Sequence, residues 1–521
     1  MRFFSKPVGL HDGPHEVRHV SPEGAAAGGR GRKPNGTKLG SGKQKSSTMP
    51  MVLVSRQNGI HGGFSVSTQS IGKTLSEATR ILRTHGLTPL RTILTPDLFR
   101  DSFPQTPPPK TILVPEVVFW LMATVALGDG AMAGCITVFW ASLRAVVPWL
   151  PLAAVTDEAF CTARGRLPLR FFLRLFAQVA GRFAKRFGSS YRWKGRRLLG
   201  IDGTDVDLPR HRPLGRIFPP ASNQHGPSGP PQARLVGLVG LWDGVCYDFR
   251  WTSLSVGEQD SARRLLRGLG PKDLVLSDRN FADMATFAAA LSCGAHFLTH
   301  MPSNRFLKLS RTPTASRRQD EWYVVLKLPR KLRQQYPQLG PQIQVRILQY
   351  QRPGFRTSWL ITSLLNPAEF PYEELVSLYH ERWRQETFHR EWKHSLQLSN
   401  LRSHSAQGLL KEVLVQLTLN NAIRWVMAEA APPPLGPVNL RFLEAKRLIL
   451  ASVAAMTAAP VGLLPGLYRD LLAAIGAERI VVRAGRNYPR KWDAKGRPKG
   501  HGKTAAPAKL SSTTEDCHAP I

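Results

Sequence analysis

Two short apolar runs that each end in an aspartate constrain the fold of this chain more than any other feature. The first covers residues 197–202 and ends in Asp202, and the second covers residues 273–278 and ends in Asp278. Short runs rich in branched aliphatic residues and bounded by turn residues are typical of buried β-strands. An acid at the exit of a buried strand is held by a rigid element and still reaches solvent, as a metal-binding carboxylate must. The alternative for each motif is an ordinary turn, because Asp and Gly favour turns.

The segment between the two aspartates predicts a β-meander followed by a helix. Residues 234–242 and 245–251 are apolar runs, and Asp243-Gly244 lies between them. Asp-Gly between two such runs predicts a β-hairpin. A helix is expected over residues 259–269, directly before the strand that ends in Asp278. This order of elements predicts an α/β protein and fits an RNase H-like core.

A second run of alternating apolar and polar residues follows, from about residue 302 to residue 357. Alternation with a period of two predicts strands with one buried face. We therefore expect a small β insertion there, closed by a strand over residues 358–363. A helix that carries Glu386 is expected to follow this strand.

Four polar residues share one face of that expected helix. Tyr379, Arg382, Glu386 and Lys393 are separated by two, three and six residues. At 3.6 residues per turn they fall within an arc of roughly 60°. The stripe combines an acid, two bases and a phenol, which is an unusual set for a structural face. The alternative is a solvated helix face with charge pairs between neighbouring turns.

Taken together, these motifs resemble those of bacterial insertion-sequence transposases of the DDE class, of the IS-four type. Asp202-Gly203-Thr204 matches the first family motif, Asp278 to Phe281 matches the second, and the Tyr-Arg-Glu-Lys spacing matches the third. The resemblance covers residues 156–403 well and the flanks weakly. It implies an α/β fold with an RNase H-like DDE catalytic core. It also implies a β-strand insertion before the last catalytic helix and helical N- and C-terminal regions.

The resemblance also implies a role for each site residue. Asp202, Asp278 and Glu386 would be the catalytic residues and would hold two Mg²⁺ ions, with Mn²⁺ as an alternative metal. One ion would activate the attacking oxygen and the other would stabilise the leaving oxygen. The DNA-binding residues would be those on the helix stripe and a tryptophan that stacks on a flipped base: Tyr379, Arg382, Lys393 and Trp359. For Trp359, a core tryptophan on a buried strand is the alternative.

The charge of the chain favours the same partner. It carries 71 Lys and Arg against 36 Asp and Glu, a net charge of +35. Such a field favours nucleic acid, with an acidic membrane surface as a weaker alternative. Residues 159–201 contain no acid and many arginines, a run that can follow a phosphate backbone. Biased codon usage explains part of the arginine content but not the missing acids.

The remaining sequence predicts the domain organisation. We expect a disordered basic tail over residues 1–70 and a helical DNA-binding region over residues 71–185. The DDE catalytic domain is expected over residues 186–405, with its β insertion at about 302–357. A helical region that supports dimerisation would cover residues 406–480, before a disordered basic tail over residues 481–521. The apolar segment from Val114 to Leu152 is interrupted by charged residues and glycines, so buried helices are favoured over a membrane span.

The expected localisation is the bacterial cytoplasm, in association with the nucleoid. The five cysteines have no paired spacing, which fits a reducing compartment and disfavours a zinc site. One departure from the family is His300-Met301, where relatives commonly place a basic residue. It puts a secondary DNA contact in doubt but not the metal site.

The function implied is cut-and-paste transposition by a protein that is a homodimer in its DNA complex. It would bind terminal inverted repeats, hydrolyse DNA at the element ends and join the freed 3′-hydroxyls to target DNA. Two alternatives remain open. One is a DNA-binding protein of transposase origin that no longer cleaves, and the other is a metal-dependent nuclease without strand transfer.

Overall fold

The computed structural model describes residues 87–105, 112–128, 130–146, 155–302, 320–352 and 355–481. The predicted tail over residues 1–70 lies outside the described residues. So do residues 482–521 of the predicted C-terminal tail and residues 303–319 of the predicted insertion.

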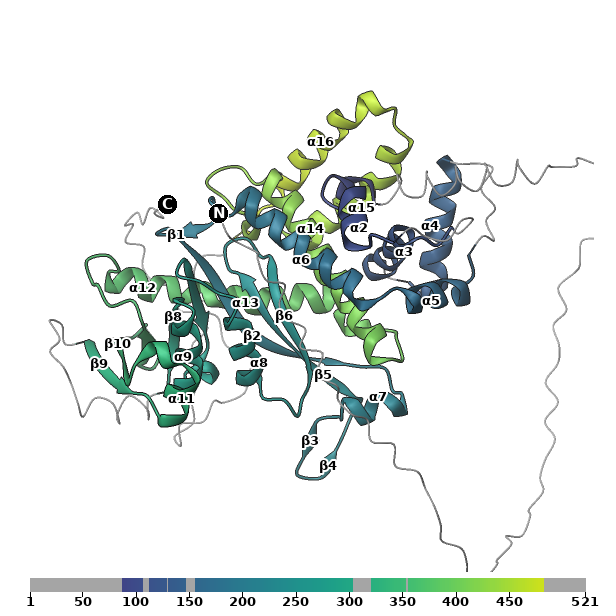
Figure 1. Ribbon diagram of the computed structural model, residues 1–521. Helices are drawn as coiled ribbons and strands as arrows, with labels where there is room; N and C mark the ends of the chain where they lie inside the picture. The colour runs from purple at the N-terminus through teal and green to yellow at the C-terminus, as the bar shows by residue number, and fades with distance from the viewer. Residues whose placement is uncertain are drawn as a thin grey trace, which may run out of the picture. The chain divides into compact units, whose positions relative to one another are not determined.

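A nine-stranded mixed sheet forms the centre of the described part of the chain (Figure 1). The strands follow the order β6-β5-β2-β7-β8-β11-β10-β9, and β1 pairs with β2. Strands β2, β7 and β8 are parallel, and the other neighbours are antiparallel. The strands are β1 (Arg192–Trp193), β2 (Arg196–Asp207), β5 (Gln232–Gly240), β6 (Cys246–Ser253), β7 (Asp273–Ser277), β8 (His296–Met301), β9 (Glu321–Lys327), β10 (Gln342–Tyr350) and β11 (Ser358–Thr362). A separate ribbon pairs β3 (Ser222–Asn223) with β4 (Gly226–Pro227).

Helices cover both faces of the sheet. The α-helices are α2 (Pro96–Ser102), α3 (Pro115–Leu127), α4 (Met132–Val146), α5 (Asp157–Arg166), α6 (Leu169–Phe187), α7 (Arg212–Ile217), α8 (Glu258–Leu266), α9 (Met284–Ser292), α11 (Arg330–Gln335), α12 (Tyr372–Tyr379), α13 (Arg384–Arg390), α14 (Ala406–Ala430), α15 (Phe442–Ala458) and α16 (Leu464–Ala477). Short 3₁₀ turns cover Thr88–Thr92, Arg279–Phe281, Pro337–Leu339, His380–Trp383, Leu398–Asn400, Pro437–Asn439 and Val461–Leu463. A π-helical turn covers Glu391–Ser395.

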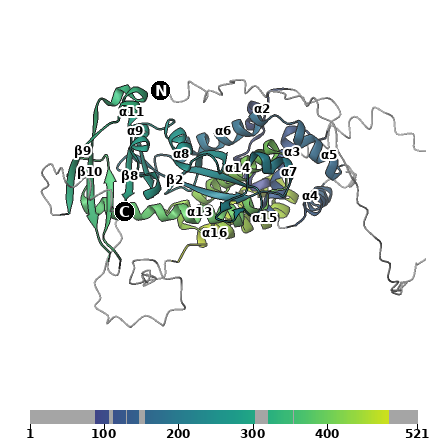
Figure 2. The ribbon, with the colours of Figure 1, turned by 90° about the horizontal axis from the view of Figure 1, so that it is seen from below.

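Two hydrophobic cores lie on the two faces of the sheet. Helices α8, α9 and α11 contribute to one of them, for example through Leu265, Phe287 and Leu332. Helices α3, α6, α13 and α14 contribute to the larger one on the other face. Figure 2 shows α8 and α9 on one side of the strands and α13 on the opposite side. The helices before and after the sheet therefore share one core with it.

The predicted hairpin is present as β5 and β6. Its turn contains Gly244 at a φ of +70°, a conformation that favours glycine, and the Asp243 carboxylate accepts a bond from the Val245 amide at 2.9 Å. The predicted helix over residues 259–269 is α8. The predicted strand over residues 358–363 is β11, and the strands of the predicted insertion, β9 and β10, extend the central sheet beyond β11.

The sequence predicted that strand β2 ends at Asp202, and this prediction is wrong. The strand continues to Asp207, because its other neighbour, β5, stays paired with it as far as Asp207 and Gln232. Pairing with β7 stops earlier, at Ile201 and Ser277. The sheet therefore opens on one side of β2 immediately before Asp202.

The first helix of the apolar N-terminal segment, α3, is largely buried inside the protein. In α3, residues 117–121 have no exposed surface. Among the described residues, no single helix is long and apolar enough to cross a membrane. The pair formed by Pro115–Leu127 and Met132–Ala141 meets that test only together, with a bend of 119° between its two halves.

Candidate catalytic carboxylate site

The two strand aspartates lie side by side where the sheet opens. Asp202 and Asp278 each follow the last residue pair between β2 and β7, Ile201 and Ser277. Local backbone bonds fix both side chains. The Asp202 Oδ1 accepts from the Gly203 amide at 2.9 Å, and the Asp278 Oδ1 accepts from the Asn280 amide at 2.8 Å. With this bond Asp278 caps the 3₁₀ turn over Arg279–Phe281.

The proximity of these carboxylates changes the acidity of Asp202. Burial and the negative charge of Asp278 raise the pKa of Asp202 from 3.8 to about 7. His389 Nδ1 lies 4.0 Å from the Asp202 Oδ2. However, burial and the nearby Lys393 lower the pKa of His389 to about 3. The imidazole is therefore neutral near pH 7 and does not compensate the charge of Asp202.

A third carboxylate, Glu258, lies beside this pair, and the sequence reasoning missed it. Glu258 is the first residue of α8. Its Oε1 lies over Gly203, where an added Cβ would be 2.0 Å away. Its Oε2 accepts from the Asn280 Nδ2 at 2.5 Å. Burial, together with the charge of Asp278, raises the pKa of Glu258. Gly203, the residue after Asp202, thus leaves room for the Glu258 carboxylate.

Glu386 lies on α13, which packs closely onto the sheet. Two strand glycines permit this approach. A Cβ on Gly200 of β2 would lie 2.4 Å from the Gln385 Oε1, and one on Gly237 of β5 would lie 2.9 Å from the Trp392 ring. Gln385 is fully buried, and Trp392 is 1% exposed and donates to the Asn420 Oδ1 of α14 at 3.2 Å. Packing on β2, β5 and α14 therefore fixes the helix that carries Glu386.

The segment from Tyr379 to Lys393 is not one regular α-helix. A 3₁₀ turn over His380–Trp383 tightens it, and a π-helical turn over Glu391–Ser395 widens it. Such irregular turns change the angle between successive side chains, so the uniform stripe expected from sequence does not apply. The Arg382 guanidinium lies 3.6 Å from the Glu386 carboxylate and also acts on the charge of Asp202.

The structure places the other predicted site residues in different surroundings. Tyr379 is only 6% exposed, and its hydroxyl donates to the Ser277 carbonyl at 3.3 Å, the residue before Asp278. Lys393 is half-buried in the π-helical turn, near His389. Trp359 is half-buried on β11 and packs against the core that contains α8 and α9. Trp383, by contrast, is 55% exposed, and the Arg382 guanidinium lies 5.5 Å from its ring centre.

Four other acids lie near these residues in the sequence and could also have been metal ligands, but each has a structural partner. Asp205 binds Arg234 at 2.7 Å, and Asp207 accepts from Gln232 at 2.6 Å. Glu381 accepts from the Trp242 indole at 3.0 Å and from Arg384, and Glu391 pairs with the buried Arg424 of α14. The candidate site therefore reduces to Asp202, Asp278, Glu258 and Glu386.

The donor set of this site fits a hard divalent cation. It consists of carboxylate oxygens, and a cation would relieve the repulsion that raises the pKa of Asp202. Within the described residues, no three His, Cys, Asp or Glu side chains come close enough together to hold a metal ion. The Glu386 carboxylate instead faces Arg382.

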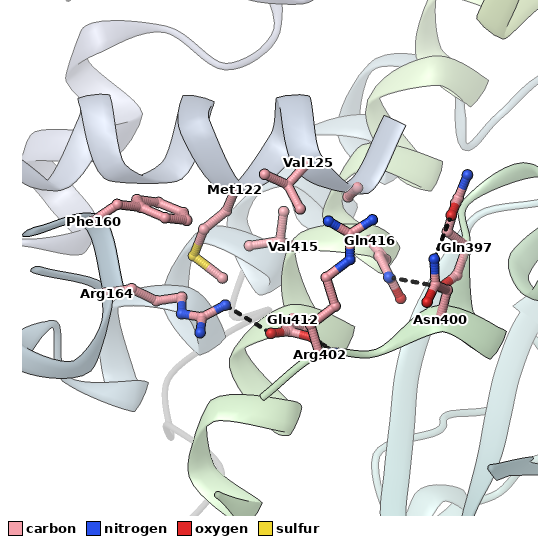
Figure 3. A pocket seen from close by; sticks show the side chains of 11 residues that line it. Met122, Val125, Phe160, Arg164, Gln397, Asn400, Arg402, Glu412, Val415 and Gln416 are labelled. Carbon is pink, nitrogen blue, oxygen red and sulfur yellow. Dashed lines mark hydrogen bonds and ion pairs between the residues drawn. The ribbon is translucent and has the colours of Figure 1, made fainter. Parts of the chain in front are cut away.

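A shallow recess elsewhere in the protein has a different character (Figure 3). It is lined by residues of α3, α5, α14 and the segment after Glu386. Arg164 and Glu412 form an ion pair of 2.7 Å across it, and Glu412 also accepts from the Arg402 amide and the Ser403 hydroxyl. These bonds join the N-terminal helices to the chain that follows Glu386, so the recess is a structural joint.

The chain is similar to known transposases. Residues 193–421 match the family described as "Transposase DDE domain". The chain is 26% identical over 340 residues to "Transposase InsG for insertion sequence element IS4" of Escherichia coli (strain K12), covering 64% of this chain and 76% of that protein. Among solved structures, it is similar to a cryo-EM structure of the piggyBac transposase synaptic complex with hairpin DNA. That match has a TM-score of 0.33 and 10% identity, and it covers 79% of this chain and 87% of the other.

Proposed function

We propose that this chain is a DDE transposase that moves an insertion sequence by a cut-and-paste reaction. The family match and the similarity to the insertion-sequence protein support a transposase, which would act as a metal-dependent polynucleotidyl transferase and endonuclease. In the proposed reaction it binds terminal inverted repeats, hydrolyses DNA at both element ends and joins the 3′-hydroxyls to target DNA. The observation that carries the proposal is the pair of aspartates, Asp202 and Asp278, at the opening between β2 and β7.

We further propose that the core is RNase H-like. Three antiparallel strands, β2, β5 and β6, precede α8, and two strands parallel to β2 follow it in the order β7, α9, β8. In such a core the two aspartates lie next to each other, on neighbouring parallel strands. The helical region before residue 186 would then recognise the element ends. The helices after residue 405 would support a homodimer in the DNA complex.

The proposed metal is Mg²⁺, as two ions held by Asp202, Asp278 and Glu386. When bound, the ions supply Lewis-acid stabilisation of the attacking and leaving oxygens in an in-line displacement. The protein's own contribution is to hold the carboxylates in a partly dry site. For Glu386 to join the two aspartates, its carboxylate must exchange its contact with Arg382 for one with the metal.

We assign the DNA contacts to cations and aromatic rings beside the carboxylates. Arg382 and Lys393 would bind phosphates through charge-assisted bonds. Trp359 would stack on a base displaced near the cleaved end. Tyr379 would contact the DNA backbone only after its hydroxyl leaves the Ser277 carbonyl. The substrate is double-stranded DNA, which places the proposed reaction at the nucleoid in the bacterial cytoplasm.

The proposal is tested by a cleavage and strand-transfer assay on the DNA ends that flank the gene, in Mg²⁺ and in EDTA. We expect end cleavage and joined products in Mg²⁺ and neither in EDTA. Specific binding without cleavage by the folded protein would instead indicate an inactive descendant of a transposase. Cleavage without joined products would indicate a nuclease.

A Glu386→Gln variant is expected to lose cleavage while it keeps DNA binding. The change removes the charge of a proposed metal ligand and almost no volume. Because Glu386 is partly exposed and, among the described residues, pairs with Arg382 alone, the fold should be little affected. Normal Mg²⁺-dependent cleavage by this variant, measured in single turnover beside the wild type, would show that Glu386 is misassigned.

A Tyr379→Phe variant is expected to be less stable by about 1 kcal/mol, the usual value of one internal hydrogen bond. Its cleavage rate should fall as well, because the Ser277 carbonyl that Tyr379 binds precedes Asp278. Tyr372→Phe is the matched control, since the Tyr372 hydroxyl also donates to a backbone carbonyl, that of Gln349. The control should lose similar stability in thermal unfolding but keep its cleavage rate. An equal loss of rate in both variants would assign Tyr379 a purely structural role.

A further inference from the structure

Most of the Lys and Arg side chains over residues 159–201 fall into two groups in the structure. The first group stabilises the fold. Its members are Arg164 with Glu412, Arg182 with Thr95, Arg192 with the Gly188 carbonyl, Lys194 with Glu374, Arg196 with Glu369 and Arg197 with Asp273. The second group is on α6 and has no such task.

Helix α6 is amphipathic, and its outer face is positively charged. Its inner side buries aromatic and aliphatic residues, among them Phe172, Phe176 and Phe183. Arg170, Arg174 and Lys185 lie on the exposed side. At about 100° per residue they share an arc of roughly 60°. Within the described residues, no hydrogen bond or ion pair engages these three side chains, and we name them the α6 basic face.

The α6 basic face lies at the level of the candidate carboxylates along the strands. Phe176, on the inner side of α6, packs edge-on against Phe249 of β6 with ring centres 5.4 Å apart. Phe249 pairs with Gly237 of β5, and Gly237 pairs with Asp202 of β2. A ligand that follows the outside of α6 therefore passes beside the strands that carry the site.

The chemistry of the face selects its ligand. It offers only guanidinium and ammonium groups, which bind phosphate, and the segment from residue 159 to residue 201 contains no acid that would repel it. From Arg170 to Lys185 the stripe is roughly 22 Å long at 1.5 Å per residue. Duplex DNA rises about 3.4 Å per base pair, so the stripe can face about six base pairs.

We propose that the α6 basic face binds the phosphate backbone of the duplex DNA that extends from the cleavage site. This surface rests on the proposed function, because it positions the same DNA substrate. Since it reads phosphates and no base edges, its contribution is independent of sequence. It fixes the direction in which the duplex leaves the carboxylate site.

The test measures the salt dependence of binding by the full chain to a duplex of arbitrary sequence. Removal of each cation that binds a phosphate should reduce the slope of log affinity against log salt by about 0.9, so that Arg170→Gln/Arg174→Gln/Lys185→Gln loses up to about 2.7, measured between about 50 and 200 mM salt. The matched control is Arg330→Gln/Lys331→Gln/Arg333→Gln. It removes three exposed cations from α11, beside the opposite edge of the sheet, and should leave the slope unchanged.

The outcomes separate this surface from the proposed function. An unchanged slope in the α6 variant, or an equal fall in both variants, would refute the proposed DNA-binding surface but not the proposed transposase function. A wild type with no affinity for DNA overturns both. A loss confined to binding of phosphatidylserine vesicles would identify a membrane as the partner and refute the DNA assignment. All three proteins should show the same thermal unfolding midpoint, since the substituted side chains are exposed.

Discussion

An Asp202→Asn variant is expected to lose DNA cleavage and, in the absence of metal, to unfold at a higher temperature than the wild type at pH 8. Both effects have one cause. The fold holds the Asp202 carboxylate in a buried position next to Asp278, and this raises its pKa from 3.8 to about 7. Asparagine keeps the shape but has no charge to bury. The substitution thus removes a proposed metal ligand and increases stability, a trade-off that is common at catalytic sites.

The direction of the pH dependence follows from the raised pKa. The folded protein binds a proton at Asp202 that the unfolded chain has already released between about pH 4 and pH 7, so wild-type stability falls as pH rises through this range. One pKa unit corresponds to about 1.4 kcal/mol. The side chain is 23% exposed and shares its repulsion with Asp278 and Glu258, so we expect on the order of 3 kcal/mol above pH 7.

Urea unfolding in EDTA at several pH values measures this difference. The stability gain of Asp202→Asn should be full at pH 8 and vanish below about pH 3, where the wild-type carboxyl is protonated in both the folded and the unfolded state. Added Mg²⁺ should stabilise the wild type at pH 8 and leave the variant unaffected. A variant that is less stable than the wild type at pH 8 would show that the Asp202 charge is already compensated in the fold.

The strands and helices that could be predicted were those with strong local signals. The Asp243-Gly244 pair predicted the hairpin of β5 and β6, because few residues other than glycine accept a φ of +70°. The helical region predicted over residues 406–480 contains α14, α15 and α16. Such long apolar segments are visible in sequence, although α14 proves to be buried on nearly all sides.

The differences arose where distant segments decide the local structure. Strand β2 continues past Asp202 because β5 remains paired with it, a partner that lies outside the local pattern. The segment before and after Glu386 adopts 3₁₀ and π turns, with Glu391 held by Arg424 and Trp392 by Asn420, both of α14. Helical periodicity assumes 3.6 residues per turn, so it cannot reveal such turns.

Glu258 was missed for a related reason. It directly precedes the helix predicted over residues 259–269, and acids are common at such positions because they favour the helix N-terminus. Its position beside Asp202 depends on the space left by Gly203 on the neighbouring strand. The glycine in Asp202-Gly203 was visible in sequence, but the side chain that occupies its space was not.

A Glu258→Gln variant is therefore expected to bind divalent cations roughly 10–100-fold more weakly, the usual effect of a residue next to metal ligands. Glu258 is partly buried beside Asp202 and Asp278, and the neutral amide of Asn280 donates a hydrogen bond to it. Its negative charge strengthens the attraction of the aspartate pair for a cation. Glutamine keeps the size of the side chain and can still accept a hydrogen bond from Asn280.

Titration calorimetry with Mn²⁺ on the DNA-free protein measures the effect without relying on cleavage. Asp205→Asn is the matched control, because Asp205 is a nearby acid on the same strand as Asp202 but is already neutralised by Arg234. If the charge of Glu258 acts on the cation, Glu258→Gln should weaken binding and slow cleavage at limiting metal, and excess Mn²⁺ should restore the rate. Equal affinities for the two variants would mean that Glu258 only fills the space above Gly203. Failure of excess metal to restore the rate would place its role in the arrangement of Asp278 through Asn280 instead.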